Sequence, residues 1–344
     1  MKVVFDAAQK RHFPKMFLSS GAQQPNPEVP ERADVLLQAA LACSLSIERA
    51  PDLGIAPAAS VHTPEYLVFL QTIHERWKRI EGASEEVIPN IHPDRRDGAY
   101  PASAVGQAGY HLTDTSCPIN GETWMSALRS AHAAAHAADI VRNGAGAAYA
   151  LCRPPGHHAF ADLAGGFCYL NNAAIAAARL AGSGGRVAIL DVDLHHGNGT
   201  QGIFYRRSDV LTVSIHADPV RFYPFFWGHA CERGEDAGLG YNLNLPLARK
   251  SGDVAFMGAL HSGLERIAAF APDALVVALG LDAHESDPFA GLSVTTEGFG
   301  SIGALIGELG LPTVLVQEGG YLNAALGANL AAFLNGFRKV RRHD

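Results

Sequence analysis

The sequence predicts an α/β fold with a mostly parallel sheet, and two observations support this prediction. Short, almost entirely apolar runs recur along the 344 residues, and polar or glycine-rich residues follow each run. This pattern is typical of parallel strands that helices cover on both faces. Alanine-rich helical stretches lie between the runs, and such alternation of strands and helices favours a layered α/β architecture.

The strands expected from these runs are, in chain order, Met1–Phe5, residues 147–152 (AAYALC), Arg186–Val192, Val210–Ile215, Ala274–Gly280 and Pro312–Gln317. The expected helices are Thr123–Arg142, Asn171–Leu180, Asp253–Phe270 and Thr296–Leu309. Residues 81–121 differ, because they are rich in proline, glycine, histidine and charge and lack strong periodicity. A loop of this length usually has a function or mediates an interaction. The sequence shows no internal repeat and no linker composition, so we expect one domain over residues 1–344.

Composition narrows the classes of function. Hydrophobic residues make up 48% and charged residues 18% of the chain, as in folded globular proteins. The net charge of −7 argues against nucleic-acid binding and is compatible with a cationic substrate. The five cysteines are widely spaced without a CxxC pair, which argues against a disulfide framework and against a cysteine-based zinc site. The sequence shows neither a signal peptide nor an apolar run of about 20 residues, so we expect a cytoplasmic protein that does not contact membranes.

Ligands of open parallel sheets bind at the carboxyl ends of the strands, so the polar segments that follow the expected strands are candidates for chemistry. These segments are RPPGHHA (153–159), DVDLHHGNGT (191–200), DAHESDP (282–288) and EGGY (318–321). Each has a simpler explanation by itself. Paired histidines are often exposed, an aspartate such as Asp282 often begins a helix, and paired glycines form tight turns. Their joint position after apolar strands favours an active site.

The segment DVDLHHGNGT (191–200) indicates a metal site. Asp193 and His195 are two residues apart, and an extended backbone would point both side chains the same way. With Asp282 they form a set of three ligands, as in catalytic zinc sites that keep a fourth position open. Oxygen and nitrogen ligands would also suit Fe(II), Co(II) or Mn(II). Beside such a metal, the paired His157 and His158 could supply a general base and an electrostatic partner.

The segments RPPGHHA, GGFCYLNNAAIAA, ILDVDLHHGNGTQ, DAHESDP and EGGY resemble, in order and spacing, the deacetylase branch of the arginase/histone deacetylase superfamily. The resemblance extends from about residue 30 to about residue 334, and bacterial acetylpolyamine amidohydrolases are the most similar members. It implies an arginase-like α/β fold with a central, mostly parallel eight-stranded sheet flanked by helices. It also implies zinc-dependent removal of acetyl groups from acetylated polyamines or related small acetylated amines. The alternatives are a deacetylase of acetyl-lysine in proteins and a non-enzymatic acyl-amine-binding module. The presence of every expected catalytic residue argues against the last.

The resemblance also implies a role for each site residue. Asp193, His195 and Asp282 would hold one zinc ion per subunit. His158 would act as general base and then as acid, and His157 would act mainly through its charge. Asp191 would be the partner of His157, and Asn198 would be the partner of His158. Tyr321 would donate a hydrogen bond to the scissile carbonyl oxygen. The wall of the substrate tunnel would contain Gly166, Phe167 and Tyr223.

Family members hold potassium as well. The positions that match one potassium site are Asp191, Asp193, His195, Ser214 and Ile215, and those that match a second are Phe204, Arg207, Val210 and Tyr241. Arginases bind two manganese ions with additional Asp and His ligands, whereas here Leu194 separates Asp193 from His195 and Leu281 precedes Asp282. A centre with one catalytic metal therefore fits the sequence better.

The long segment 81–121 is expected to mediate a homodimer near the active-site entrance, as in dimeric relatives. It also departs from the polyamine-specific members, whose acidic residues help bind the distal ammonium of the substrate. Ser116 and Val105 stand where glutamates are expected. Asp114 or Glu122 could take their place, but the sequence does not show that either reaches the substrate tunnel.

Overall fold

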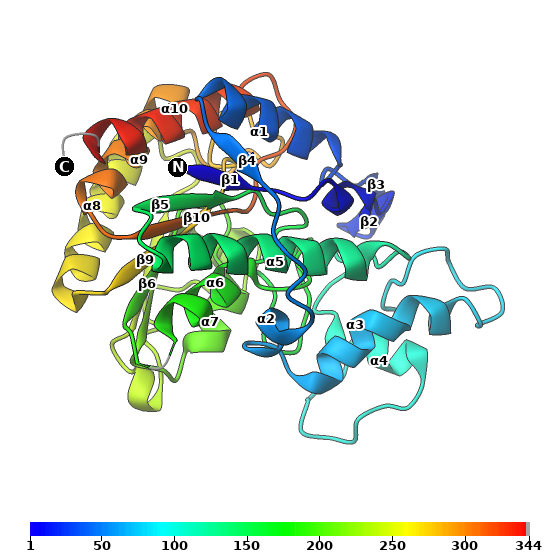
Figure 1. Cartoon of the computed structure of the whole chain (residues 1–344). Coiled ribbons are helices and arrows are strands. Elements are labelled where there is room, and N and C mark those ends of the chain that lie inside the picture. Colours follow the sequence, from blue (N-terminus) through cyan, green and yellow to red (C-terminus); the bar gives the residue numbers. More distant parts are fainter. Residues whose placement is uncertain (183, 342–344) are drawn as a thin grey trace.

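Eight parallel strands form the centre of the computed structural model, which describes residues 1–182 and 184–341. Their order across the sheet is β4-β1-β5-β10-β9-β6-β7-β8 (Figure 1). The strands are β1 (Lys2–Val4), β4 (Ser46–Glu48), β5 (Ala147–Ala150), β6 (Val187–Asp191), β7 (Val210–Ala217), β8 (Asn242–Leu247), β9 (Ala274–Leu279) and β10 (Thr313–Gln317). A small antiparallel hairpin pairs β2 (Met16–Ser19) with β3 (Ala22–Pro25). The expectation of an eight-stranded, mostly parallel sheet is confirmed.

Helices cover both faces of this sheet. They are α1 (Glu31–Ala42), α2 (Ala56–Ala59), α3 (Pro64–Trp77), α4 (Ala104–His111), α5 (Thr123–Arg142), α6 (Asn172–Ala181), α7 (Asn198–Phe204), α8 (Asp253–Phe270), α9 (Thr296–Glu308) and α10 (Leu326–Val340). One buried cluster joins the sheet to α1, α8, α9 and α10, and a second joins it to α5, α6 and the end of α7. The molecule therefore has three layers, with the sheet in the middle (Figure 1).

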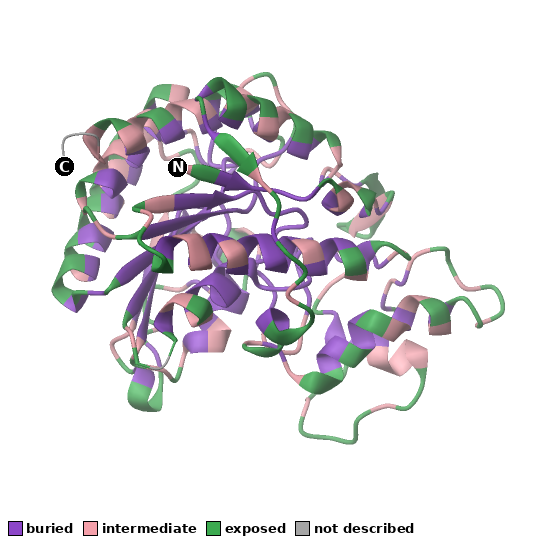
Figure 2. Cartoon of the chain, viewed as in Figure 1, coloured by how far each residue is buried: buried purple, intermediate pink, exposed green. Residues whose placement is uncertain are grey.

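Side chains of the central strands alternate between the two cores. In β6, Ala188 and Leu190 belong to the first cluster, whereas Val187 and Ile189 belong to the second. This alternation follows from the two-residue period of a strand. Because both faces are covered, the strand carries apolar residues at consecutive positions, which explains the continuous apolar runs of the sequence. Figure 2 shows the central strands as buried along most of their length.

Residues 81–121 contain a helix that the sequence prediction missed. The Ser103 side chain accepts a hydrogen bond from the Gly106 backbone N–H at 3.0 Å and so caps the first turn of α4. Two glycines lower the intrinsic helix propensity of this segment. One of them is required by packing, because a Cβ at Gly109 would lie 1.8 Å from the Ile91 carbonyl oxygen. α4 packs against α3 in a third buried cluster that extends away from the sheet (Figure 1).

Two further expectations can be compared with the structure. All five cysteines are free, as their spacing predicted. Over residues 1–182 and 184–341, none of the helices has the length and apolar character needed to cross a membrane.

Candidate metal centre and substrate cavity

The predicted site residues meet at the carboxyl ends of β5, β6, β9 and β10, because the loops that follow these strands converge there. A cavity of about 750 Å³ opens above them. His158, His195, Asn198 and Tyr321 line it, together with a largely aromatic wall.

Asp193, His195 and Asp282 form a buried cluster in which one ligand atom from each residue lies within 4.8 Å of the others. His195 Nδ1 is 3.1 Å from Asp282 Oδ2 and 3.3 Å from Asp193 Oδ1. The expectation of extended backbone at Asp193 and His195 was wrong, because β6 ends at Asp191 and the chain then bends. The His195 backbone N–H donates to Asp193 Oδ1 at 2.8 Å, and this turn brings the two side chains together.

The donor set fits a divalent cation. One oxygen of each carboxylate is held by a backbone N–H: Gly319 donates to Asp193 Oδ2 at 2.8 Å, and Leu194 donates to Asp282 Oδ1 at 3.0 Å. The other oxygen of each lies beside His195 Nδ1. Burial and the Asp193 charge raise the pKa of Asp282, because two carboxylates share one enclosed space. A bound cation would relieve this repulsion, and nitrogen and oxygen ligands without thiolate suit zinc among other metals.

The paired histidines have different partners. His157 Nδ1 lies 2.9 Å from Asp191 Oδ2, and His158 Nδ1 lies 2.7 Å from Asn198 Oδ1. The two imidazole rings are 4.0 Å apart between centroids. Because a carboxylate and an amide oxygen each accept a hydrogen bond from an N–H, both rings carry hydrogen on Nδ1.

The surroundings of the two rings shift their pKa values in opposite directions. Burial lowers the pKa of His157, but the negative charges of Asp193 and Asp191 outweigh burial and hold it well above its usual value. Burial and the neighbouring charges of His157 and His195 hold the pKa of His158 well below its usual value. The surroundings therefore favour the protonated form of His157 and the neutral form of His158.

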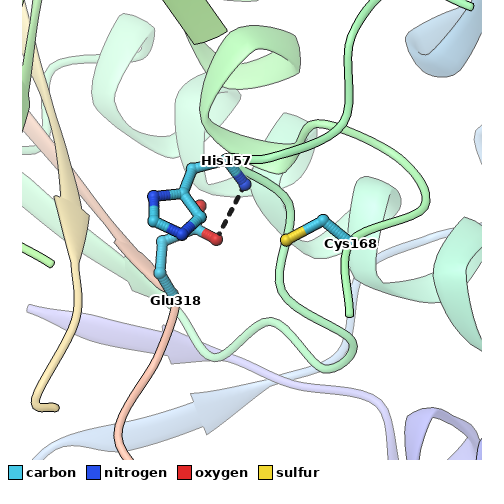
Figure 3. Close-up of side chains that lie close together, drawn as sticks. All are labelled: His157, Cys168 and Glu318. Atoms are coloured by element: carbon cyan, nitrogen blue, oxygen red, sulfur yellow. Dashed lines mark hydrogen bonds between the residues drawn. The ribbon is translucent and has the colours of Figure 1, made fainter. Parts of the chain in front are cut away.

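Glu318 directly follows the buried strand β10 and begins the candidate segment EGGY, but the sequence reasoning gave it no role. Its carboxylate accepts hydrogen bonds from the backbone N–H groups of Gly156 at 2.6 Å and His157 at 3.0 Å. Figure 3 shows it beside the His157 ring and the Cys168 thiol, all three being buried. Burial raises the pKa of Glu318 to about 7. Glu318 thus anchors the loop of the paired histidines to the end of β10, and a charged residue directly after an apolar strand was the signal in the sequence.

Tyr321 is held by residues that the sequence reasoning also missed. Its backbone N–H donates to Asp287 Oδ2 at 3.0 Å, and its ring packs edge-on against Phe289 with 4.8 Å between centroids. The Arg32 guanidinium lies 4.8 Å from the centre of the Tyr321 ring and donates to the carbonyl oxygen of Glu318 at 2.8 Å. Arg32 comes from α1, so no local pattern around Tyr321 could have identified it.

The expected tunnel residues Gly166, Phe167 and Tyr223 all line the cavity. Asp114 lies in the same wall, where it accepts a hydrogen bond from the Tyr223 hydroxyl at 2.7 Å. Glu122 lies elsewhere, exposed at the start of α5, with Arg11 as its ion-pair neighbour at 3.9 Å. Of the two acidic candidates, the structure therefore brings only Asp114 to the cavity.

The residues that match potassium sites lie around β6 and β7. Asp191 and Ser214 face each other in the register of these strands and line a small cavity of about 10 Å³, and Ile215 follows in β7. Phe204 ends α7, Val210 begins β7 and Tyr241 precedes β8. The Arg207 side chain pairs with Asp209, while its backbone N–H donates to the Phe204 carbonyl oxygen at 2.9 Å.

Comparison with known proteins extends these observations. The histone deacetylase domain matches residues 26–337. Acetylpolyamine amidohydrolase from Burkholderia pseudomallei is 50% identical over 342 residues, which cover 99% of this chain and 100% of that protein. Acetylpolyamine amidohydrolase 1 from Pseudomonas aeruginosa is 45% identical over 347 residues, which cover 99% of this chain and 100% of that protein. The crystal structure of acetylpolyamine aminohydrolase from Burkholderia pseudomallei superposes with a TM-score of 0.96 and covers 99% of both chains.

Proposed function

Because the chain belongs to the histone deacetylase domain family, we propose that it is a zinc-dependent amidohydrolase. Its substrates are acetylated polyamines or related small acetylated amines, from which it releases acetate. The observation that carries this proposal is the buried cluster of Asp193, His195 and Asp282 below a cavity that His158 and Tyr321 line. The names of the full-length relatives support the choice of substrate.

Asp193, His195 and Asp282 would hold the zinc ion through two carboxylate oxygens and His195 Nδ1. Zinc at such a site supplies Lewis acidity, which activates water and polarises a carbonyl group. The backbone N–H groups of Gly319 and Leu194 orient the carboxylates before the metal binds.

His158 acts as the general base. The hydrogen on its Nδ1 is engaged by Asn198 Oδ1, so Nε2 is free to take a proton from the attacking water and to return it to the leaving amine. His157, whose pKa the negative charges of Asp193 and Asp191 raise, stabilises negative charge that develops in the transition state.

Tyr321 donates a hydrogen bond to the substrate carbonyl oxygen as that oxygen becomes negative. Contacts with Phe289 and with the Arg32 guanidinium hold the Tyr321 ring at the cavity wall. The aromatic lining, which includes Phe167 and Tyr223, excludes water from the methylene chain of the substrate.

Acetate release from N-acetylputrescine, N-acetylcadaverine and N1-acetylspermidine tests the proposal beside an acetyl-lysine peptide, before and after chelation and zinc restoration. We expect zinc-dependent release from the free amines and little from the peptide. Comparable or faster release from the peptide would assign the chain to the acetyl-lysine deacetylases. If the zinc-loaded protein releases acetate from none of these compounds, that result would contradict the enzyme proposal and favour an acyl-amine-binding module.

The Asp282→Ala variant tests the ligand set directly. Removing one of three ligands leaves an incomplete site, so we expect the zinc affinity to fall at least about 100-fold. Metal content after dialysis, measured by mass spectrometry, checks this result. Stoichiometric zinc and unchanged turnover in the variant would exclude Asp282 as a ligand.

We further propose potassium binding at the positions named above and a homodimer through residues 81–121. Asp191 and Ser214 beside a small polar cavity support a potassium site, and the exposed length of the 81–121 segment supports the interface. Stability measured in potassium and sodium salts tests the ion, and light scattering on the purified chain tests the dimer.

The five free cysteines support a reducing compartment such as the cytoplasm.

A further inference from the structure

We propose that His157, Cys168 and Glu318 form a second metal site, which takes a divalent cation that accepts thiolate and which lowers turnover when it is occupied. One ligand atom from each residue lies within 4.8 Å of the others, and all three side chains are buried. In the described part of the chain, only the catalytic cluster forms another such group of potential ligands. Binding of the ion is independent of the deacetylase function proposed above, whereas the effect on turnover rests on it.

Three separate segments bring these side chains to one place. β5 and β10 are neighbours in the sheet, and the loops that follow them carry His157 and Glu318. Cys168 comes from the turn before α6, in which its N–H donates to the Gly165 carbonyl oxygen at 2.8 Å. Figure 3 shows the thiol and the carboxylate pointing towards the same space beside the His157 ring. The fold itself therefore assembles the group.

Each residue has a ligand atom to offer. His157 Nδ1 lies 2.9 Å from Asp191 Oδ2, so the ring has Nε2 to offer. Glu318 Oε2 accepts the two backbone hydrogen bonds described above, which hold the carboxylate in place. Glu318 Oε1 is buried and has no hydrogen-bond partner among the residues that the structure describes. An unpartnered buried oxygen is costly, and a bound cation would satisfy it.

The chemistry of these ligands selects the kind of ion. A thiol, an imidazole and a carboxylate suit Zn²⁺ and related cations such as Co²⁺. Binding displaces the proton of the Cys168 thiol, and any proton on the other two ligand atoms, to water, because metals coordinate the deprotonated forms. One thiolate and one carboxylate then balance the two positive charges of the ion. The occupied site is neutral as a whole, which is far less costly to bury than a separate charge.

Occupation would affect catalysis through His157. Its Nε2 lies 3.8 Å from Asp193 Oδ1, so the nitrogen that would bind the additional ion also borders the catalytic cluster. An ion on Nε2 takes the lone pair of this nitrogen, and the ring can then no longer donate a hydrogen bond from it to the reacting groups. Because the three ligands are buried, the ion should enter slowly, and the loss of turnover should develop with time.

Cobalt reports a thiolate ligand directly. When the zinc-loaded full chain is titrated with Co²⁺, we expect a thiolate-to-cobalt charge-transfer band, which the catalytic cluster cannot produce because it contains no sulfur. Cys168→Ser should abolish this band. Two controls should retain it: Cys117→Ser removes another buried thiol, and Cys231→Ser removes the exposed one.

A second variant tests the carboxylate. Glu318→Gln keeps an oxygen for the two backbone N–H groups but loses the negative charge, so we expect the Co²⁺ affinity to fall at least about 10-fold. The melting temperature of each variant reports its folding. If Cys168→Ser does not fold, the affinity of Glu318→Gln decides on the site, and an unchanged affinity would refute it.

Acetate release from N-acetylputrescine measures the consequence for turnover. After incubation with excess Zn²⁺ we expect kcat of the wild-type protein to fall at least about 10-fold below its value with equimolar Zn²⁺. Cys168→Ser should keep the activity that it has with equimolar Zn²⁺.

Several results would overturn the inference. A titration without a thiolate band, or a band that Cys168→Ser retains, would refute the site, and so would a band that disappears in Cys231→Ser. A band in the wild-type protein together with unchanged turnover in excess Zn²⁺ would refute the effect on catalysis. If the chain hydrolyses no acetylated amine, the deacetylase function is contradicted, and the cobalt spectra still decide on the metal site.

Discussion

Burial and nearby charges make the two adjacent histidines differ. The carboxylates of Asp193 and Asp191 hold the pKa of His157 well above its usual value, whereas burial and the charges of His157 and His195 hold the pKa of His158 well below it. Two side chains of the same type, adjacent in the chain, thereby differ in their affinity for a proton. The Asn198 amide accepts from His158 without adding the negative charge that Asp191 places beside His157.

Exchanging the amide for a carboxylate tests this explanation. In Asn198→Asp the new negative charge raises the pKa of His158, so the free base forms only at higher pH. We expect the acidic limb of the kcat/KM profile to lie at higher pH in this variant than in the wild-type protein. The profile of the zinc-loaded variant against pH checks this shift, and coincident profiles would contradict it.

His62 makes stability depend on pH at a place away from the metal cluster. Burial lowers the pKa of His62 to about 4, and its Nε2 accepts a hydrogen bond from the Asn171 N–H at 2.9 Å. The unfolded chain takes up the proton near pH 6.5, so the free energy of unfolding falls as the pH drops from about 6.5 to about 4. Over this window the loss amounts to about 3 kcal/mol.

In His62→Gln the side-chain oxygen can accept from the Asn171 N–H, but the group does not titrate. We therefore expect the pH dependence below pH 6.5 to flatten relative to the wild-type protein. Urea unfolding at pH 5, 6 and 7 measures the difference. Parallel pH dependences in the two proteins would show that another group is responsible.

Among the elements, α9 and α10 approach so closely that some positions accept only glycine. A Cβ at Gly303 would lie 2.2 Å from the Phe333 carbonyl oxygen, whereas a Cβ at Gly300 would meet its nearest atom, the Ala332 carbonyl oxygen, at 3.7 Å. We expect Gly303→Ala to destabilise the fold by about 1–3 kcal/mol through overpacking. Gly300→Ala should be neutral or stabilising by up to about 1 kcal/mol, because alanine favours a helix.

Thermal unfolding of the two variants compares one glycine with another in the same helix. Equal melting temperatures would contradict the close approach of α9 and α10. A lower melting temperature for Gly300→Ala than for Gly303→Ala would also contradict this close approach.

Elements with strong periodicity could be predicted from the sequence, and those selected by tertiary contacts could not. The bounds Thr123–Arg142 and Asp253–Phe270 were predicted as the structure has them. β8 was missed because its NLNLPL sequence lacks the continuous apolar run of the other expected strands, although such alternation also favours a strand. α4 was missed because packing against the Ile91 backbone requires a glycine where a helix usually avoids one.

At the scale of the whole molecule, a buried ionic network ties the N-terminal segment to the catalytic loops. Glu28 Oε1 lies 2.6 Å from the Arg32 guanidinium and 2.9 Å from that of Arg153, and all three side chains are buried. Arg32 reaches the carbonyl oxygen of Glu318, and Arg153 precedes the loop of the paired histidines. Glu28 thus compensates two cations that hold opposite sides of the site.

Removing that negative charge should affect the entire fold. In Glu28→Gln two buried guanidinium groups lose their carboxylate, so we expect a loss of about 3–5 kcal/mol in the free energy of unfolding. Glu31→Gln, at an exposed position in the first turn of α1, should cost less than about 1 kcal/mol. Denaturant titration of both variants measures the contrast. A similar small effect for both would show that the network contributes little.

Site residues within local motifs could be predicted, whereas their distant supports could not. Asp193, His195 and Asp282 could be proposed from short motifs after apolar runs, and the structure brings them together. Arg32 and Glu28 lie more than 120 residues before the loops that they support, and nothing near them in the sequence resembles a site. Asp114 remained one of two candidates until folding placed it in the cavity wall.

The two outer strands of the sheet limit how copies of this chain can associate. β4 is only 3 residues long and carries Glu48, which pairs with Lys2 on the adjacent strand. β8, at the opposite margin, contains Pro246, which has no N–H to offer to another backbone. Short, charged or proline-containing margins are a common protection against fibril growth by strand addition. Concentrated solutions of the folded protein should therefore resist conversion to cross-β aggregates, and assembly should involve side-chain surfaces such as the 81–121 segment.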